Sequence, residues 1–180
     1  LAAGLLDCFD GRIARTKKDR SHQQQSFGIQ IDSLNDVLCF GALPSVAGYC
    51  AWSRWSDAPT PVWYGAALCV FTLAGLIRLA YFNVTEEENQ AKGQLVRKVY
   101  TGLPVTSAAL IFPTFLLIDY VTPADIAIGY YAIMLLTAFL FVSKISVRKP
   151  GFKGIMIMVA FGAAEFALMM LLKLLGVHPL

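Results

Sequence analysis

Four aspartates stand in two closely spaced pairs near the beginning of a mostly apolar chain. Asp7 and Asp10 are three residues apart, and Asp32 and Asp36 are four apart, so each pair lies on one face if its segment is helical. The polar stretch between the pairs can reverse the chain and bring the two helix ends together. Converging carboxylates repel one another unless cations neutralise them, and hard oxygen ligands suit Mg²⁺ or Mn²⁺. The spacing predicts a divalent-cation site; the alternative is that these acids only cap helices at an interface.

The aspartates lie in a chain with the composition of an integral membrane protein. Of the 180 residues, 57% are hydrophobic and 15% are charged, whereas soluble domains have roughly 45–50% and 25%. Mean hydropathy is +0.59. The apolar residues predict an all-α transmembrane bundle, a single membrane-embedded domain over 1–180, with about six apolar helices. These are expected at residues 1–14, 30–52, 61–83, 103–120, 124–143 and 153–175. The first segment is too short to cross a bilayer and starts without Met, so we expect an N-terminal span to be missing or incomplete.

Basic residues gather in alternate connections between these segments. Connections 11–27, 84–99 and 144–153 hold most of the Lys and Arg, whereas 53–60 and 121–123 hold only Arg54. The positive-inside rule then places the basic connections and the aspartates on the cytoplasmic side, which in bacteria is the inner face of the cytoplasmic membrane. Because this topology accounts for the net charge of +3, no nucleic-acid partner is expected. The stretch "TEEENQAKGQ" is expected to be a solvated loop.

Two other groups of residues are assigned structural roles. The cysteines lie within or beside apolar segments without CxxC spacing, which predicts neither a disulfide nor a zinc site. Glu165 and Lys173 are eight residues apart on one face of the last segment. Glu165 lies in the middle of that segment, where it needs a hydrogen-bond partner within the bundle or in another subunit; a role in a proton path is the alternative.

Small and basic residues beside the acids suit a phosphate-bearing ligand. Gly11 and Ala14 lie within a turn of Asp10, and Gly28 lies one turn before Asp32. Small residues let helices, or a flat ligand, approach closely, and the sequence favours neither use over the other. Arg15 is the natural partner for a phosphate group.

The two aspartate pairs lie in a pattern that resembles the signature of the CDP-alcohol phosphatidyltransferases, DxxDGxxAR followed by GxxxDxxxD. The stretches "DCFDGRIAR" and "GIQIDSLND" match every fixed position, although the interval after Arg15 is longer than in the common pattern. Residues 1–113 carry these motifs, and 114–180 resemble the family only in hydropathy. "DSLNDVLCFGALP", "LIRLAYFNV" and "TGLPVTSAA" resemble the branch that uses serine. That branch commonly has arginine where this chain has Tyr81.

The resemblance implies transfer of the phosphatidyl group of CDP-diacylglycerol to the hydroxyl of L-serine, with phosphatidylserine and CMP as products. Two Mg²⁺ or Mn²⁺ ions are implied, with Asp36 as the general base. The implied metal ligands are Asp7, Asp10, Asp32 and Asp36. Binding of CDP-diacylglycerol is expected from Asp7, Gly11, Ala14, Arg15 and Gly28. Candidates for binding serine are Arg78, Asn83, Arg97 and Lys98. The family resemblance also implies a homodimer surrounded by membrane lipids.

Other functions are compatible with the same residues. A sister transferase could use glycerol phosphate or inositol phosphate, although such acceptors need a denser cationic pocket. A divalent-cation transporter would also need clustered acids, but transporter sites usually lie near the middle of the bilayer, often on broken helices. A catalytically silent membrane scaffold would not need the complete set of aspartates.

Overall fold

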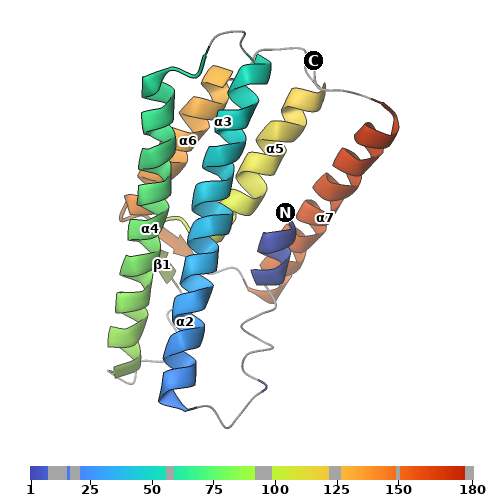
Figure 1. Ribbon diagram of the computed structural model, residues 1–180. Coiled ribbons are helices and arrows are strands. Elements are labelled where there is room, and N and C mark those ends of the chain that lie inside the picture. The colour runs from blue at the N-terminus through green and yellow to red at the C-terminus, as the bar shows by residue number, and fades with distance from the viewer. Residues whose placement is uncertain are drawn as a thin grey trace.

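A computed structural model of the protein consists mainly of helices standing side by side (Figure 1). The residues that it describes are 1–7, 16, 21–55, 59–91, 99–121, 127–148 and 151–176. Residues 2–7 form a helical segment at the N-terminus, hereafter the N-terminal segment. Every predicted apolar segment contains helix, but the helix ends differ from the prediction at several places.

The longest rod in the structure consists of three consecutive helices without a break (Figure 1). They are α2 (His22–Asp36), the π-helix η1 (Val37–Ala42) and α3 (Leu43–Trp55). The rod begins at a capping box, in which the backbone amide of Gln24 donates to Ser21 Oγ at 3.2 Å and the amide of Ser21 donates to Gln24 Oε1 at 3.4 Å. The predicted helix began eight residues too late, at residue 30, because a capping box starts a helix without needing apolar residues.

Helix α4 (Val62–Ala91) also extends beyond its predicted end at residue 83. The prediction of a solvated loop for "TEEENQAKGQ" was therefore wrong for Thr85–Ala91, which are helical. Glu, Gln and Ala are good helix formers, and the stretch Thr85–Lys92 contains neither Gly nor Pro. Hydropathy locates the part of a helix that is buried in lipid or protein, but it does not detect a polar extension of the same helix.

The packed core lies between α4, α6 (Ala127–Val142) and α5 (Ala108–Val121). Phe71 of α4 is fully buried, and its ring centroid lies 5.1 Å from that of Phe112 and 5.6 Å from that of Phe141. Tyr130 of α6 is also fully buried, and its hydroxyl donates to the carbonyl of Pro44 at 2.8 Å. These contacts join α3, α4, α5 and α6 into one body.

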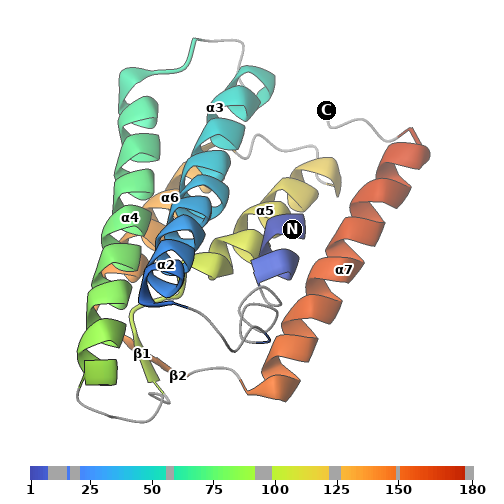
Figure 2. The same ribbon diagram turned by 60° about the horizontal axis from the view of Figure 1, so that its bottom comes forward.

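Helix α7 (Phe152–Leu174) stands apart from α3, α4 and α6 and packs along α5 (Figure 2). A hydrogen bond between Thr114 of α5 and the buried Glu165 of α7 joins the two helices. The predicted partner for Glu165 within the bundle is thus confirmed. The span Lys153–Leu174 and the span Val62–Glu88 are long and apolar enough to cross a membrane, whereas the apolar helices at Val105–Ile118 and Ala127–Val142 are shorter. Six membrane crossings remain a prediction.

A short antiparallel ribbon was not predicted from the sequence. Strands β1 (Val99–Thr101) and β2 (Ser146–Arg148) pair with Tyr100 opposite Val147. Strand β2 lies within the basic connection 144–153, and β1 begins at the last residue of the basic connection 84–99, so these connections meet at the ribbon. The start of α2 and the end of α4 lie toward the same end (Figure 1). The alternation of connections between the two sides of a membrane stays a prediction.

Candidate metal and substrate site

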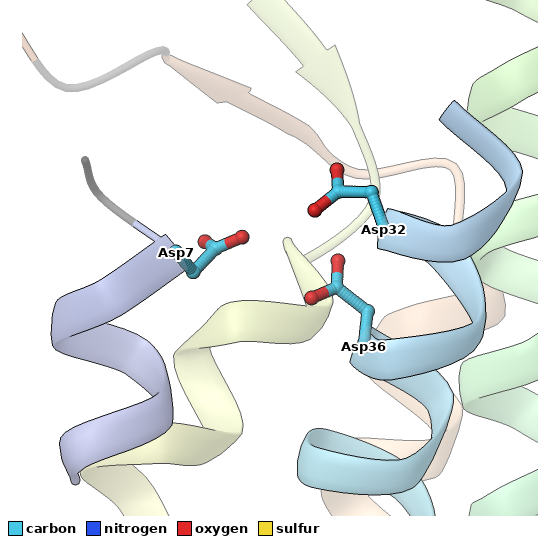
Figure 3. Close-up of side chains that lie close together, drawn as sticks. All are labelled: Asp7, Asp32 and Asp36. Carbon is cyan, nitrogen blue, oxygen red and sulfur yellow. The ribbon is translucent and has the colours of Figure 1, made fainter. Parts of the chain in front are cut away.

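Three of the four predicted acids meet at one point. Asp7 comes from the N-terminal segment, and Asp32 and Asp36 come from one face of α2 (Figure 3). One carboxylate oxygen of each lies within 4.8 Å of the others. Asp32 is exposed, Asp7 is partly buried and Asp36 is only 7% exposed. The cluster therefore has an open side and a buried side.

The local structure of the α2–η1–α3 rod fixes how Asp36 is presented. Asp36 is the last residue of α2, and η1 begins at the next residue. The π-helix η1 separates the acid-bearing helix α2 from α3. Ser45, at the start of α3, lies with its hydroxyl 3.1 Å from the carbonyl oxygen of Gly41 and 3.0 Å from that of Leu68 on α4. The rod thus carries the acids on α2 and packs against α4 through Ser45 of α3.

Asp7 is positioned by close packing of the N-terminal segment against α5. A Cβ at Gly4 would lie 2.6 Å from the Cβ of Ala109, so only glycine allows this approach without a shift. On the other side of the cluster, η1 contacts the short 3₁₀-helix η2 (Val105–Ser107), which leads into α5. The chain around the start of α5 therefore contacts the N-terminal segment, which carries Asp7, and η1, which directly follows Asp36.

The neighbours of the acids are held by hydrogen bonds between helices. Asn83 on α4 donates to Ser33 Oγ at 2.7 Å, and Ser33 Oγ donates to the carbonyl of Ile29 at 2.9 Å. Ser33 directly follows Asp32, so α4 helps to fix the acid-bearing face of α2. Sequence reasoning did not single out this pairing. A Cβ at Gly28 on the same helix would meet nothing within 4 Å in the part of the chain that the structure describes.

Arg78 on α4 is buried, with 5% of its surface exposed. Its Nε donates to the carbonyl of Leu103 at 3.0 Å, and Nη2 donates to the carbonyl of Gly102 at 3.4 Å. Sequence reasoning missed Gly102, although "TGLP" with glycine shortly before proline is a turn signal. Direct binding of serine by Arg78 or Asn83 remains a prediction. The other predicted site residues lie outside the described part of the chain: Asp10, Gly11, Ala14, Arg15, Arg97 and Lys98.

The donor set of the cluster fits a hard divalent cation. Carboxylate oxygens are the ligands that Mg²⁺ and Mn²⁺ prefer, and oxygens this close to one another can bind the same ion. Asp32 is the exposed member of the cluster, on the side from which a phosphate-bearing ligand could reach the ion. The arrangement can therefore serve reactions of phosphate groups.

Comparison with known proteins agrees with this chemistry. The profile described as CDP-alcohol phosphatidyltransferase matches residues 1–171, which is nearly the whole chain. The chain belongs to the CDP-alcohol phosphatidyltransferase family. This confirms the family resemblance found in the two aspartate motifs, and it extends the match beyond residue 113, where the motifs end.

Several relatives within the family are named for serine chemistry. CDP-diacylglycerol–serine O-phosphatidyltransferase of Helicobacter pylori is 30% identical over 158 residues, covering 86% of this chain and 60% of that protein. The protein of the same name from Mycobacterium leprae is 32% identical over 109 residues, covering 61% of this chain and 33% of that protein. Archaetidylserine synthase of Methanothermobacter thermautotrophicus is 31% identical over 136 residues, covering 76% of this chain and 52% of that protein. The chain thus spans only part of the length of these relatives.

Proposed function

We propose that this chain is the catalytic domain of a CDP-diacylglycerol–serine O-phosphatidyltransferase. The observation that carries the proposal is the meeting of Asp7, Asp32 and Asp36 within 4.8 Å. In a member of this family, such a cluster suits the handling of a pyrophosphate. The serine acceptor is supported by the names of the relatives, because two of those described above are transferases named for serine.

The aspartates have two roles in the proposed reaction. Asp7, Asp10, Asp32 and Asp36 hold Mg²⁺ or Mn²⁺, two ions in all. Cations held there would supply positive charge that offsets the negative charge of the pyrophosphate. Asp36 accepts the proton of the serine hydroxyl, whose oxygen forms a new bond to the phosphorus of the phosphatidyl group. The bond from that phosphorus to the oxygen of CMP breaks, and CMP leaves.

The remaining predicted residues bind and orient the two substrates. Arg15 pairs with the pyrophosphate, while Gly11, Ala14 and Gly28 leave space for the nucleotide to approach. The serine carboxylate needs a cationic or amide partner. The candidates for that partner are Arg97, Lys98, Arg78 and Asn83. The sequence pattern places neither His22 nor His178 close to Ser33, the serine that directly follows Asp32, so we propose direct transfer without a covalent enzyme intermediate.

The protein is an integral membrane protein in this proposal, as its apolar spans and family suggest. The site faces the cytoplasm of a bacterial cell, and two copies form a homodimer. Support for the orientation comes from the ribbon β1–β2, which joins two basic connections at one end of the bundle. Acyl chains can then remain in the bilayer while serine arrives from water.

A transfer assay tests the proposal. The purified protein is given CDP-diacylglycerol with serine, glycerol phosphate, inositol phosphate or inositol in parallel, each with Mg²⁺, with Mn²⁺ or with a chelator. We expect CMP release only with serine and a divalent cation. Release with another acceptor would assign the chain to a sister transferase. Absence of release with every acceptor, in protein that is folded and binds Mn²⁺, would favour a transporter or a scaffold.

A further inference from the structure

A buried cation on α4 holds a turn that lies beside the acid cluster. Arg78 is 5% exposed and donates from two different nitrogens to two successive backbone carbonyls, those of Gly102 and Leu103. A buried guanidinium is costly unless hydrogen bonds compensate for lost water. These two bonds compensate part of that cost. They also tie α4 to the residues that separate β1 from η2.

The turn itself is tightly constrained from the other side. Gly102 has a φ of +84°, and its amide donates to the carbonyl of Ile145 at 2.6 Å. The amide of Leu103 donates to the carbonyl of Leu140 at 3.1 Å. A Cβ at Gly102 would lie 2.8 Å from the carbonyl oxygen of Ser143, so another residue would displace the turn. The backbone amides of the turn thus donate to α6 and to the residues that follow it. The carbonyls of the turn accept hydrogen bonds from Arg78.

The chain that leaves this turn passes between the two acid-bearing elements. Figure 3 shows it running from β1 into α5 between the N-terminal segment and α2. On one side η2 contacts η1, which directly follows Asp36. On the other side Ala109 of α5 touches Gly4, three residues before Asp7. A shift of the turn would therefore move Asp7 relative to Asp32 and Asp36.

We propose that Arg78 is a positioning residue for the metal site. By fixing the carbonyls of Gly102 and Leu103, it sets the separation between the carboxylate of Asp7 and those of Asp32 and Asp36. The inference rests on the proposed function because it takes the cluster to be the cation site. It differs from the direct contact between Arg78 and the serine carboxylate that the sequence suggested, since two of the arginine's nitrogens are directed at the turn.

The two roles for Arg78 predict different defects. A positioning residue alters the affinity of the protein for the cation, and the KM for serine at saturating cation stays the same. A residue that binds the serine carboxylate alters the KM for serine, and cation affinity in the absence of substrates stays the same. Cation affinity can be measured without turnover from the loss of the electron paramagnetic resonance signal of free Mn²⁺.

The test uses Arg78→Met and Gly102→Ala in the full chain, purified in detergent. Gly102→Ala displaces the same turn without removing a charge, so it also serves if Arg78→Met does not fold. Ser45→Ala is the matched control, because Ser45 is also buried and bonded to backbone carbonyls but lies on α3, where one of those carbonyls is that of Leu68 on α4. Loss of a group that orients metal ligands weakens binding by about 10- to 100-fold. We expect that loss in both turn variants, with Ser45→Ala within about twofold of the unmodified protein.

Each outcome of this test decides between the alternatives. Unchanged Mn²⁺ affinity in folded Arg78→Met would overturn the inference. If Arg78→Met does not fold, unchanged affinity in folded Gly102→Ala would do the same. Failure of the unmodified protein to bind Mn²⁺ would also overturn it. Weakened affinity in the turn variants supports it, even if the unmodified protein fails to transfer to serine. That last result would overturn the proposed function alone.

Discussion

The amide of Asn83 on α4 donates a hydrogen bond of 2.7 Å to the hydroxyl of Ser33 on α2. The two bonded residues are 50 positions apart in the chain, and Ser33 directly follows Asp32. This contact gives Asn83 a structural role that is separate from binding the substrate serine: Asn83 holds the acid-bearing face of α2 against α4.

Replacement of Asn83 separates this role from substrate binding. We expect Asn83→Ala and Ser33→Ala each to lower the free energy of unfolding by about 1 kcal/mol, because each removes the same hydrogen bond. In a double-mutant cycle the two losses should not add. The measurement is denaturant unfolding in detergent, with the KM for serine determined in parallel. A rise in the KM for serine in Asn83→Ala, but not in Ser33→Ala, would show instead that Asn83 binds the acceptor.

Gly28 distinguishes close approach of a ligand from close packing of helices. A Cβ there meets nothing within 4 Å among the described residues, and alanine is favoured over glycine inside a helix by roughly 0.5–1 kcal/mol. We therefore expect Gly28→Ala to stabilise the protein by that amount while raising the KM for CDP-diacylglycerol. Gln25→Ala on the exposed part of the same helix is the control. Destabilisation by Gly28→Ala would mean that helix packing is the reason for the glycine.

The link between α5 and α7 should contribute to stability but not to metal binding. Thr114 bonds to Glu165, whose Oε2 is buried without a hydrogen-bond partner in the part of the chain that the structure describes. Thr114→Val leaves a buried carboxyl without its partner and should cost about 1–3 kcal/mol of unfolding free energy. Adding Glu165→Leu removes that buried group and should restore most of the loss. Reduced Mn²⁺ affinity in the double variant would contradict this separation of roles.

Asp36 provides a direct test of the proposed base. Loss of a positioned general base slows turnover by about 10²- to 10⁴-fold, and we expect Asp36→Asn to fall in this range. Folding should persist, because removing one negative charge relieves repulsion from Asp7 and Asp32. Thermal unfolding with and without Mn²⁺ checks that the variant is folded, because a cation that binds the folded state stabilises it. Near-normal turnover in Asp36→Asn would show that another group accepts the proton.

The sequence predicted those features that depend on local spacing and hydropathy. The pairing of Asp32 with Asp36 follows from helical periodicity, and their meeting with Asp7 follows from reversal of the chain between two helices. Apolar segments predicted where helices lie. The early start of α2 and the late end of α4 were missed because capping and helix propensity, not hydropathy, determine those ends.

Other features depend on contacts between distant parts of the chain and could not be predicted. Three-residue strands carry too little pattern to be recognised, and β1 pairs with β2 only because α5 and α6 bring them together. The sequence indicated that Arg78 needs a polar partner in an apolar span. It gave no means of choosing between a substrate and the carbonyls of Gly102 and Leu103, because only the folded chain brings that turn to α4.

The cation site is tested directly by locating Mn²⁺ with anomalous X-ray scattering from crystals of the protein. We predict a peak between the carboxylates of Asp7, Asp32 and Asp36, at about 2.0–2.2 Å from their nearest oxygens. That peak should disappear in Asp32→Asn crystals that retain the fold. Mn²⁺ bound elsewhere, with the three carboxylates left without an ion, would show that Asp7, Asp32 and Asp36 do not form the cation site.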